Sequence, residues 1–287
     1  MQNVNGILIP IGGNEDKGTE QNELYRCDFI DDGILNHVVK ESGGINANIV
    51  IIPTASSIPT EVGDNYIQAF AALGCKNVSV LDIRSKVDSE KQVSIDLIRN
   101  ADCIMFSGGD QSQITNKIGG TTIHKILLDR YKNDEGFVIA GTSAGAMAMT
   151  NEMISGGSAS EAFFKGAVDL YKGLALIPEL IIDTHFIKRG RFGRQAEVVA
   201  KFPNLIGIGL AEDTGMIIKN GKDCTVIGSG MAIIFDGSSL LHNNEHLLKT
   251  GVPMTITNLK VHILSNGDHF DIQNRQVTVL PIEAPFI

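Results

Sequence analysis

The sequence predicts an α/β protein with a doubly wound, mostly parallel sheet, helices on both faces and antiparallel strands toward the C-terminus. Through residues 6–214, short apolar runs alternate with helical segments, as in βαβ units. Several of these runs are apolar throughout, which is typical of strands buried on both faces of a parallel sheet. Residues 216–287 instead contain short, closely spaced strands and an Asn-Gly turn.

The expected elements follow in chain order. Residues 6–11, 48–54, 77–83, 101–106, 137–140, 180–182 and 206–211 are predicted strands, and residues 61–73, 94–100, 122–132 and 195–201 are predicted helices. The helix at residues 61–73 is predicted because Tyr66, Phe70 and Leu73 form an apolar stripe and Gly74 stands where a helix C-cap belongs.

The C-terminal part begins with a predicted hairpin. The Asn220-Gly221 pair is a strong signal for a tight turn between the segments 216–222 and 224–227. Further short strands are expected at residues 232–235, 261–264 and 277–280. We interpret residues 216–287 as an antiparallel extension of one domain that spans residues 1–287, because no linker or internal repeat separates them.

Composition narrows the class of protein. Of the 287 residues, 43% are hydrophobic and 20% charged, as in ordinary globular proteins, and the net charge of −9 argues against nucleic-acid or membrane partners. The four cysteines are scattered without a C-x-x-C pattern, which favours buried thiols in a reducing compartment. Without a basic leader or an apolar run of membrane-spanning length, the expected location is the cytoplasm.

The most informative stretch surrounds Ser143. An apolar strand ends in Gly141-Thr142-Ser143-Ala144-Gly145 and passes directly into helix-forming residues. This strand-turn-helix setting is the one in which a nucleophilic serine is exposed at the end of a strand. In that setting the Ala144 amide and the helix N-terminus would face an oxyanion. A small-residue turn that only lets a helix pack closely is the alternative.

Other strand ends carry similar glycine-rich polar turns. The first strand ends in Gly12-Gly13, followed by Glu15 and Asp16, and the strand 101–106 ends in Gly108-Gly109, followed by Asp110 and Gln111. Ligands of doubly wound sheets bind outside the carboxyl ends of the strands. We therefore expect these turns to lie near Ser143.

Two more strand ends supply partners for a serine. His185 follows the strand 180–182 and Glu212 follows the strand 206–211, so that Ser143, His185 and Glu212 form the set needed for acyl transfer. Asp183 and Asp213 are rival acids. Arg189, Arg191 and Arg194 form the densest basic patch and suit a carboxylate clamp, with a solvated helix face as the alternative.

Together these motifs resemble the cyanophycinases, serine exopeptidases in the same family as aspartyl dipeptidase. The resemblance rests on residues 141–146, 107–111, 183–186 with the three arginines, and 207–214, and residues 10–17 also look like the start of that family. The matches run in order through roughly three quarters of the chain.

The resemblance implies a triad of Ser143, His185 and Glu212, with an oxyanion hole formed by the amides of Gly109 and Ala144. It also implies a homodimer and the substrate cyanophycin, a poly-aspartate with arginine side chains that is cut to β-Asp-Arg dipeptides. Substrate contacts are then expected from Asp110, Gln111, Asp183, Thr184, Arg189, Arg191, Arg194, Glu15 and Asp16. The arginines suit aspartyl carboxylates, and an acid such as Glu15, Asp16 or Asp183 suits the substrate guanidinium.

One departure from the family concerns Thr184, where cyanophycinases usually carry glutamine. A shorter side chain without an amide points to an alternative substrate, an ordinary aspartyl or isoaspartyl peptide. A non-catalytic binding protein of the same fold is a third reading. No cofactor is expected, and no set of residues with metal-ligand spacing is present, since His262 and His269 stand without a partner ligand.

Overall fold

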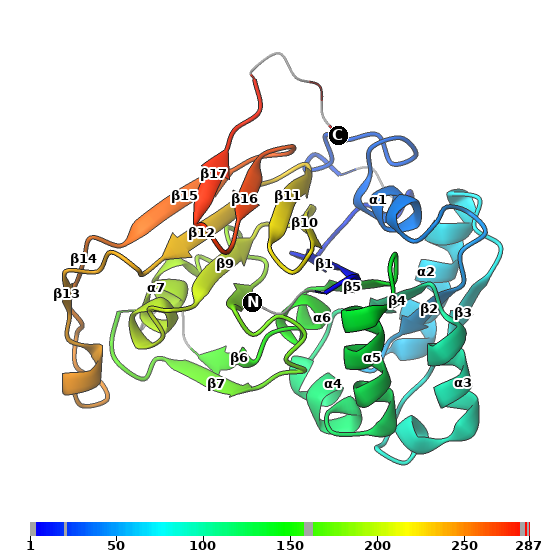
Figure 1. Cartoon of the computed structure of the whole chain (residues 1–287), viewed down its shortest axis with the longest axis horizontal. Helices are drawn as coiled ribbons and strands as arrows, with labels where there is room; N and C mark the ends of the chain where they lie inside the picture. The colour runs from blue at the N-terminus through cyan, green and yellow to red at the C-terminus, as the bar shows by residue number, and fades with distance from the viewer. Residues whose placement is uncertain (1–3, 20–21, 158–162, 282–284, 286) are drawn as a thin grey trace.

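The computed structural model describes residues 4–19, 22–157, 163–281, 285 and 287. It confirms the predicted α/β class, with a large sheet flanked by helices and antiparallel strands toward the C-terminus (Figure 1). The parallel half of this nine-stranded sheet has the order β1 (Ile7–Ile11), β5 (Val138–Thr142), β4 (Cys103–Phe106), β2 (Ile49–Ile52) and β3 (Val78–Val80). The antiparallel half continues from β1 through β10 (Thr214–Lys219), β11 (Asp223–Gly228), β16 (His269–Asp271) and β17 (Gln276–Thr278).

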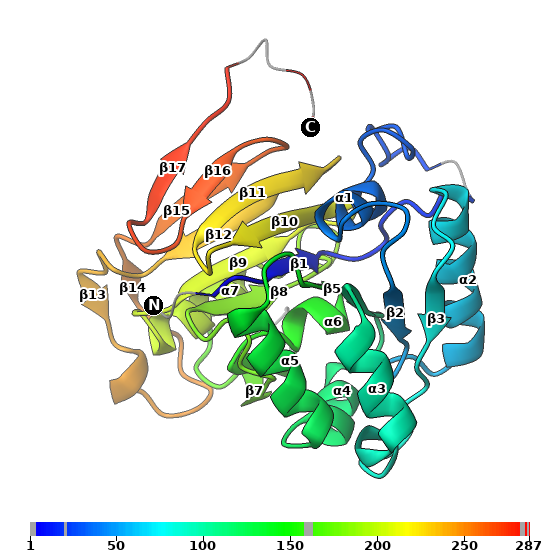
Figure 2. The same cartoon turned by 45° about the vertical axis from the view of Figure 1, so that its right-hand side comes forward.

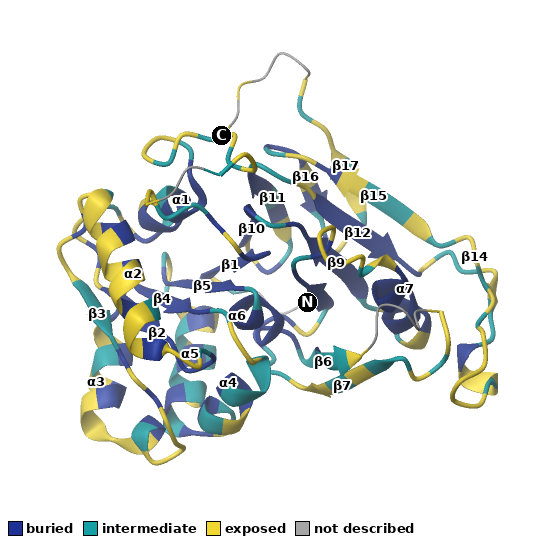
Figure 3. Ribbon diagram, turned by 180° about the vertical axis from the view of Figure 1, so that it is seen from behind, coloured by how far each residue is buried: buried dark blue, intermediate teal, exposed yellow. Residues whose placement is uncertain are grey.

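Helices cover both faces of the parallel half, as Figure 2 shows. One face carries α1 (Ile34–Glu41) and α2 (Pro59–Ala72), and the other carries α3 (Gln92–Asn100), α4 (Gln111–Ile118) and α5 (Thr122–Asn133). Alternate residues of each strand enter the two cores: in β1, Ile7 and Ile9 pack with α1 and α2, whereas Leu8 packs on the opposite side. The strands β1, β5, β4 and β2 are therefore buried between two helical layers, and the edge strand β3 is half-buried, as Figure 3 shows.

A second sheet of four strands stands beside the antiparallel half. Its order is β15 (Lys260–Leu264), β12 (Ala232–Asp236), β9 (Ile206–Leu210) and β8 (Leu180–Asp183), and β8 and β9 run parallel to each other. One face of this sheet shares a core with β10 and β11, and the other is covered by α7 (Phe192–Lys201). The smaller elements are the strand pairs β6 (Glu152–Gly157) with β7 (Val168–Lys172) and β13 (His242–Asn243) with β14 (Ile256–Thr257), and the short 3₁₀ helices η1 (Asp88–Glu90) and η2 (Glu245–Leu247).

The C-terminal strands bear out the predicted hairpin. Asn220 and Gly221 both have positive φ, 55° and 68°, and connect β10 to β11 with Lys219 opposite Asp223. The remaining strands divide between the two sheets, which their local sequence does not indicate. That residues 1–287 form one domain stays a prediction, supported by β10, which pairs with β1 at the other end of the chain. Among the described residues, no helix is long and apolar enough to cross a membrane.

Candidate active site

Ser143 occupies the sharp turn between β5 and the short helix α6 (Ala144–Met147). Its backbone angles, φ 50° and ψ −109°, lie in a region that non-glycine residues rarely adopt. The turn is tight enough that a Cβ on Gly145 would lie 2.7 Å from the Phe106 carbonyl oxygen. Strand, turn and close helix contact together give the geometry expected of a nucleophile elbow.

The helix that follows Ser143 is shorter than the sequence suggested. The helix-forming run 146–149 is expected to continue it, but α6 has only 4 residues, and Thr150 then forms a β-bridge with Ile177. So short a helix has little macrodipole. Any stabilisation of an anion at Ser143 therefore depends on individual backbone N–H groups.

His185 and Glu212 reach Ser143 from two neighbouring strands of the smaller sheet. His185 follows β8 and Glu212 follows β9, and these strands are paired in parallel with Asp183 opposite Gly209. His185 Nδ1 lies 2.8 Å from Glu212 Oε1, and His185 Nε2 lies 3.0 Å from Ser143 Oγ. The other Glu212 oxygen accepts a hydrogen bond of 3.1 Å from Lys188 Nζ.

The electrostatic setting favours a neutral imidazole beside an ionised carboxylate. Burial lowers the pKa of His185 below its usual value, assisted by Arg189 and Arg191 and opposed by Glu212. Burial acts to raise the pKa of Glu212, but its hydrogen bonds from His185 and Lys188 outweigh this, and the pKa lies below the usual value. A neutral His185 that donates Nδ1–H to Glu212 presents Nε2 as an acceptor to the serine hydroxyl.

Ser143 and His185 border an open cleft of about 450 Å³, whereas Glu212 lies outside its lining. The cleft is lined by Gly13, Asn14, Glu15, Lys17, Val62, Asn65, Tyr66, Gly108, Gly109, Thr142, Ser143, His185 and Arg189. Two of the glycine-rich strand ends singled out in the sequence therefore lie beside Ser143, as expected. Neither the Gly109 nor the Ala144 N–H donates a hydrogen bond within the described part of the chain.

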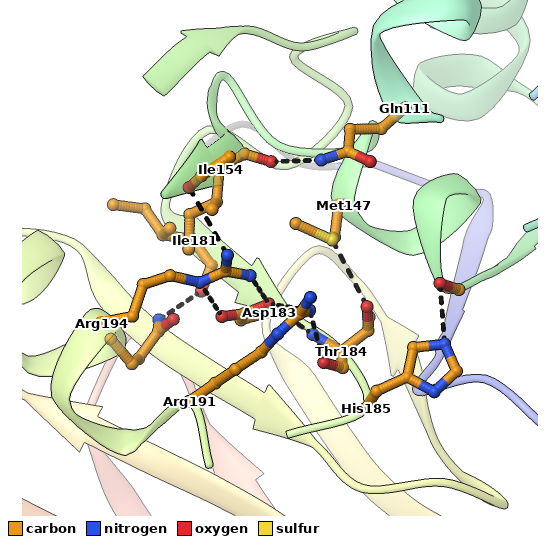
Figure 4. Close-up of polar contacts among 12 residues, drawn as sticks. Gln111, Met147, Ile154, Ile181, Asp183, Thr184, His185, Arg191 and Arg194 are labelled. Atoms are coloured by element: carbon orange, nitrogen blue, oxygen red, sulfur yellow. Dashed lines mark hydrogen bonds and ion pairs between the residues drawn. The ribbon is translucent and has the colours of Figure 1, made fainter. Parts of the chain in front are cut away.

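The expected substrate residues Asp183, Arg191 and Arg194 bind one another instead of facing the cleft (Figure 4). Asp183 is fully buried and accepts hydrogen bonds from Arg194 Nε (2.8 Å), Arg194 Nη2 (2.6 Å) and Arg191 Nη1 (2.8 Å). Arg194 is itself only 5% exposed. This placement argues for a structural ion cluster and against direct contact of Asp183 or Arg194 with substrate.

Three further predicted residues also bind elsewhere in the chain. Thr184 is buried and its hydroxyl donates to Met147 Sδ (3.3 Å), and Gln111 Nε2 donates to the Ile154 carbonyl oxygen (2.7 Å), as Figure 4 shows. Asp110 is the N-cap of α4, where its carboxylate accepts from the Ser112 N–H (2.9 Å). Neither Asp110 nor Gln111 is among the residues that line the cleft.

The remaining candidates differ in their availability to a ligand. Arg189 is exposed at the cleft, whereas Glu15, which also lines it, is buried and bound to Lys17, Tyr66 and Thr142. Asp16 is half-buried, and its carboxylate accepts from the Gly18 N–H (2.8 Å).

The rival acid Asp213 is turned away from the histidine. One of its carboxylate oxygens accepts from the Asp16 N–H at 3.2 Å. Its backbone has a positive φ of 46°, so Glu212 and Asp213 project in different directions although they are adjacent in sequence. Of the two acids, Glu212 is the one that contacts His185.

Sequence reasoning missed Lys188 and Tyr66 as neighbours of the site. Lys188 is a single exposed lysine in a basic stretch, and nothing in its local pattern indicates a contact with Glu212. Tyr66 belongs to the apolar stripe of α2, and its hydroxyl donates to Glu15, 51 positions earlier. Only the tertiary fold brings these groups together. In the described residues, no group of three or more His, Cys, Asp or Glu side chains could hold a metal ion.

An α/β fold with a serine, a histidine and a carboxylate in series at strand ends defines the class of serine-type hydrolases. The family model of peptidase family S51 matches residues 28–226. The chain belongs to this family of serine-type peptidases.

Curated relatives agree with that membership, and a solved structure shares the fold. The chain is 36% identical to the cyanophycinase of Trichormus variabilis over 274 residues. This match covers 96% of this chain and 87% of the relative. It is 34% identical to the cyanophycinase of Geminocystis herdmanii, over 96% of this chain and 97% of the relative. A crystal structure of a peptidase from an acI-B1 Actinobacterium shares the fold, with a TM-score of 0.65 at 18% identity over 94% of this chain and 98% of the other.

Proposed function

We propose that the protein is a serine exopeptidase that hydrolyses cyanophycin to β-Asp-Arg dipeptides through an acyl-enzyme on Ser143. The observation that carries the proposal is the contact series Ser143–His185–Glu212 at an open cleft. The substrate class is supported by relatives that are named cyanophycinases and match nearly the whole chain.

In the acylation step, His185 Nε2 takes the proton of Ser143 Oγ as the oxygen attacks the scissile carbonyl carbon. Glu212 holds Nδ1–H and stabilises the imidazolium that forms. The carbonyl electron pair moves onto oxygen, where the N–H groups of Gly109 and Ala144 stabilise it. When the tetrahedral intermediate collapses, the carbon–nitrogen bond breaks and His185 returns the proton to the leaving amine.

Deacylation repeats the sequence with water as nucleophile. His185 takes a proton from the water, the resulting oxygen attacks the acyl carbon, and the proton passes to Ser143 Oγ as the ester bond breaks. The neutral state of His185 favoured by its lowered pKa is the state that both half-reactions require.

For substrate binding we propose Arg189 as the partner of an aspartyl carboxylate. It lines the cleft beside Ser143 and His185, and its guanidinium suits bidentate recognition of a carboxylate. For the substrate guanidinium, Asp16 is the most available of the three acids considered, because Glu15 and Asp183 are both paired with cations. Within the described residues, Asp16 has no salt-bridge partner.

A second candidate is a related peptidase that acts on other aspartyl or isoaspartyl peptides. The observation that favours it is Thr184, which is 1% exposed and directs its hydroxyl to Met147, so that it presents no amide to a substrate. A binding protein of the same fold without catalytic activity is the third candidate.

The experiment that separates these functions is incubation with purified cyanophycin, with products analysed by mass. We expect wild type to release β-Asp-Arg and the Ser143→Ala variant to release none while keeping its unfolding temperature. A wild type that is labelled at Ser143 by a serine-directed phosphonate but leaves cyanophycin intact would favour the second candidate. Failure of both labelling and hydrolysis would favour a binding protein.

We further propose a cytoplasmic homodimer. Four free cysteines, three of them buried, support a reducing compartment. The dimer follows from the family resemblance, and light scattering coupled to size exclusion would test it through the mass of the particle in solution.

A further inference from the structure

Three consecutive carbonyl groups at the end of β1 each accept a hydrogen bond from a different loop of the proposed triad. The Ile11 oxygen accepts from the Ser143 N–H (2.8 Å), and the Gly12 oxygen accepts from the His185 N–H (2.8 Å). The Gly13 oxygen accepts from the N–H of Asp213 (2.9 Å), the neighbour of Glu212. Residues 11–13 therefore link loops that come from both sheets.

The contact with His185 extends to its side chain. Gly13 has a φ of 106°, and a Cβ built on it would lie 2.4 Å from Cε1 of the His185 ring. The imidazole is thus packed directly on the backbone of this segment. Any displacement of residues 11–13 would move the histidine and the serine relative to each other.

Glu15 connects the same segment to the residue before the nucleophile. Its Oε2 accepts a hydrogen bond of 2.6 Å from the Thr142 hydroxyl, and its Oε1 accepts from the Tyr66 hydroxyl and from Lys17 Nζ (2.8 Å). Glu15 is only 2% exposed, and both of its carboxylate oxygens accept hydrogen bonds within the protein. These contacts remove Glu15 from the set of residues that could bind a substrate guanidinium.

We propose that Glu15 is a positioning residue that holds the Ser143 turn in place through Thr142, without touching substrate. The inference rests on the proposed function, because it presumes that Ser143 is the nucleophile. The backbone at Ser143 is held at φ 50°, a conformation that persists only where the surroundings fix it. The Ile11 carbonyl holds the N–H of Ser143, and the Thr142–Glu15 bond holds the side chain of the residue that precedes it.

The surroundings of Glu15 favour the ionised form of its carboxylate. Burial acts to raise its pKa, but Lys17 and the hydrogen bonds from Lys17, Thr142 and Tyr66 outweigh burial, and the pKa lies below the usual value. An ionised carboxylate accepts hydrogen bonds only, so it orients the Thr142 hydroxyl in one direction. A neutral amide at the same place would set a donor against one of these hydroxyls or against Lys17.

The test compares Thr142→Val, which removes the hydroxyl at similar volume, with Thr142→Ser, which keeps it, and with Glu15→Gln. Two rates are measured: phosphonate labelling of Ser143, and release of β-Asp-Arg with kcat and KM determined separately. We expect Thr142→Val and Glu15→Gln to lower kcat and the labelling rate about 10- to 100-fold, as a displaced catalytic group does. KM should stay within about threefold, and Thr142→Ser should restore most of the rate.

The matched control is Asp236→Asn, another buried carboxylate that binds a cation, Arg275, and a hydroxyl, Ser238. Asp236 pairs with Ile206 at the start of β9, at the opposite end of that strand from Glu212. We expect this variant to label and hydrolyse as wild type does, even where its unfolding temperature falls.

The inference would be overturned if Thr142→Val and Glu15→Gln were labelled at Ser143 as fast as wild type. It would also be overturned if Asp236→Asn lost as much labelling rate as these two variants. The wild type separates this inference from the proposed function. If wild type is labelled but releases no β-Asp-Arg, only the substrate assignment fails, and the labelling rates still decide the role of Glu15. If wild type is not labelled at all, the nucleophile proposal fails and the inference falls with it.

Discussion

Substitution of Asp183 by asparagine tests whether the buried ion cluster is structural. Asp183 is fully buried and accepts four hydrogen bonds, three from Arg191 and Arg194 and one from the Thr184 N–H. Asparagine of the same shape keeps one acceptor oxygen, removes the negative charge and turns an N–H₂ group toward a guanidinium. Arg194, only 5% exposed, is then left as a buried cation without its counter-charge.

Breaking a buried pair in this way typically costs about 3–5 kcal/mol of unfolding free energy. At roughly 2–4 °C per kcal/mol for a chain of this size range, the unfolding temperature should fall by about 6–20 °C. Calorimetry or circular dichroism on wild type and Asp183→Asn measures the shift, with Asp16→Asn as the control that should shift it by less than about 2 °C.

A different result is expected if Asp183 contacts substrate and has no structural role. If Asp183 instead binds the substrate guanidinium, Asp183→Asn will keep its unfolding temperature and raise KM for the arginine-bearing substrate. Activity measured well below the unfolding transition distinguishes this outcome from loss of folded protein.

The remaining predictions concern the reaction itself. Because burial holds the pKa of His185 below 6.5, kcat/KM should be constant at neutral pH and fall at lower pH as His185 is protonated. The pH at which kcat/KM is halved should lie below 6.5, and a value above 6.5 would contradict His185 as the base. Arg189→Ala should raise KM about tenfold or more through loss of a charged contact. Its unfolding temperature should be unchanged, because the side chain is exposed. An equal rise in KM for a substrate without a free carboxylate would refute the proposed role of Arg189.

Much of the fold could be predicted because apolar runs and their breakers are local signals. Strands such as β2 and β4 are wholly apolar, and α2 ends where Gly74 takes a φ of 86°. The helices α1 and α4 were not predicted. The β-branched residues of α1 also suit a strand, and α4 contains only two apolar residues, Ile114 and Ile118, too few for a clear helical stripe.

The strand expected at residues 77–83 is shorter in the structure, where only residues 78–80 pair with β2 at the edge of the sheet. The assignment of strands to two sheets was not accessible either. β12 and β15 have the same local pattern as β10 and β11, and only pairing between distant segments separates them.

The candidate site was likewise predictable where local sequence decides the structure, and not where tertiary packing decides it. Parallel strands end at a common edge, so the sequence could bring His185 and Glu212 together at the ends of β8 and β9. Ser143 ends a strand of the other sheet, so its 3.0 Å contact with His185 follows from the meeting of two sheets, which strand order in the sequence does not indicate. The sequence also groups Arg191 and Arg194 in one basic patch, and both bind Asp183 from one face at the start of α7. Whether that face looks into the cleft or into the protein depends on how the start of α7 packs, which local spacing does not encode.

The origin of the three residues has a consequence for how the site responds to mutation. His185 and Glu212 come from adjacent strands of one sheet, so their contact is fixed by the β8–β9 register. Ser143 comes from the other sheet, so the Ser143–His185 distance depends on how the two sheets meet, where the carbonyls of residues 11–13 join them. Substitutions at this junction should therefore disturb the serine–histidine contact and leave the histidine–glutamate contact intact. That separation is visible by NMR: in Thr142→Val the downfield Nδ1–H resonance of His185 should persist while the labelling rate of Ser143 falls, whereas Glu212→Gln should abolish both.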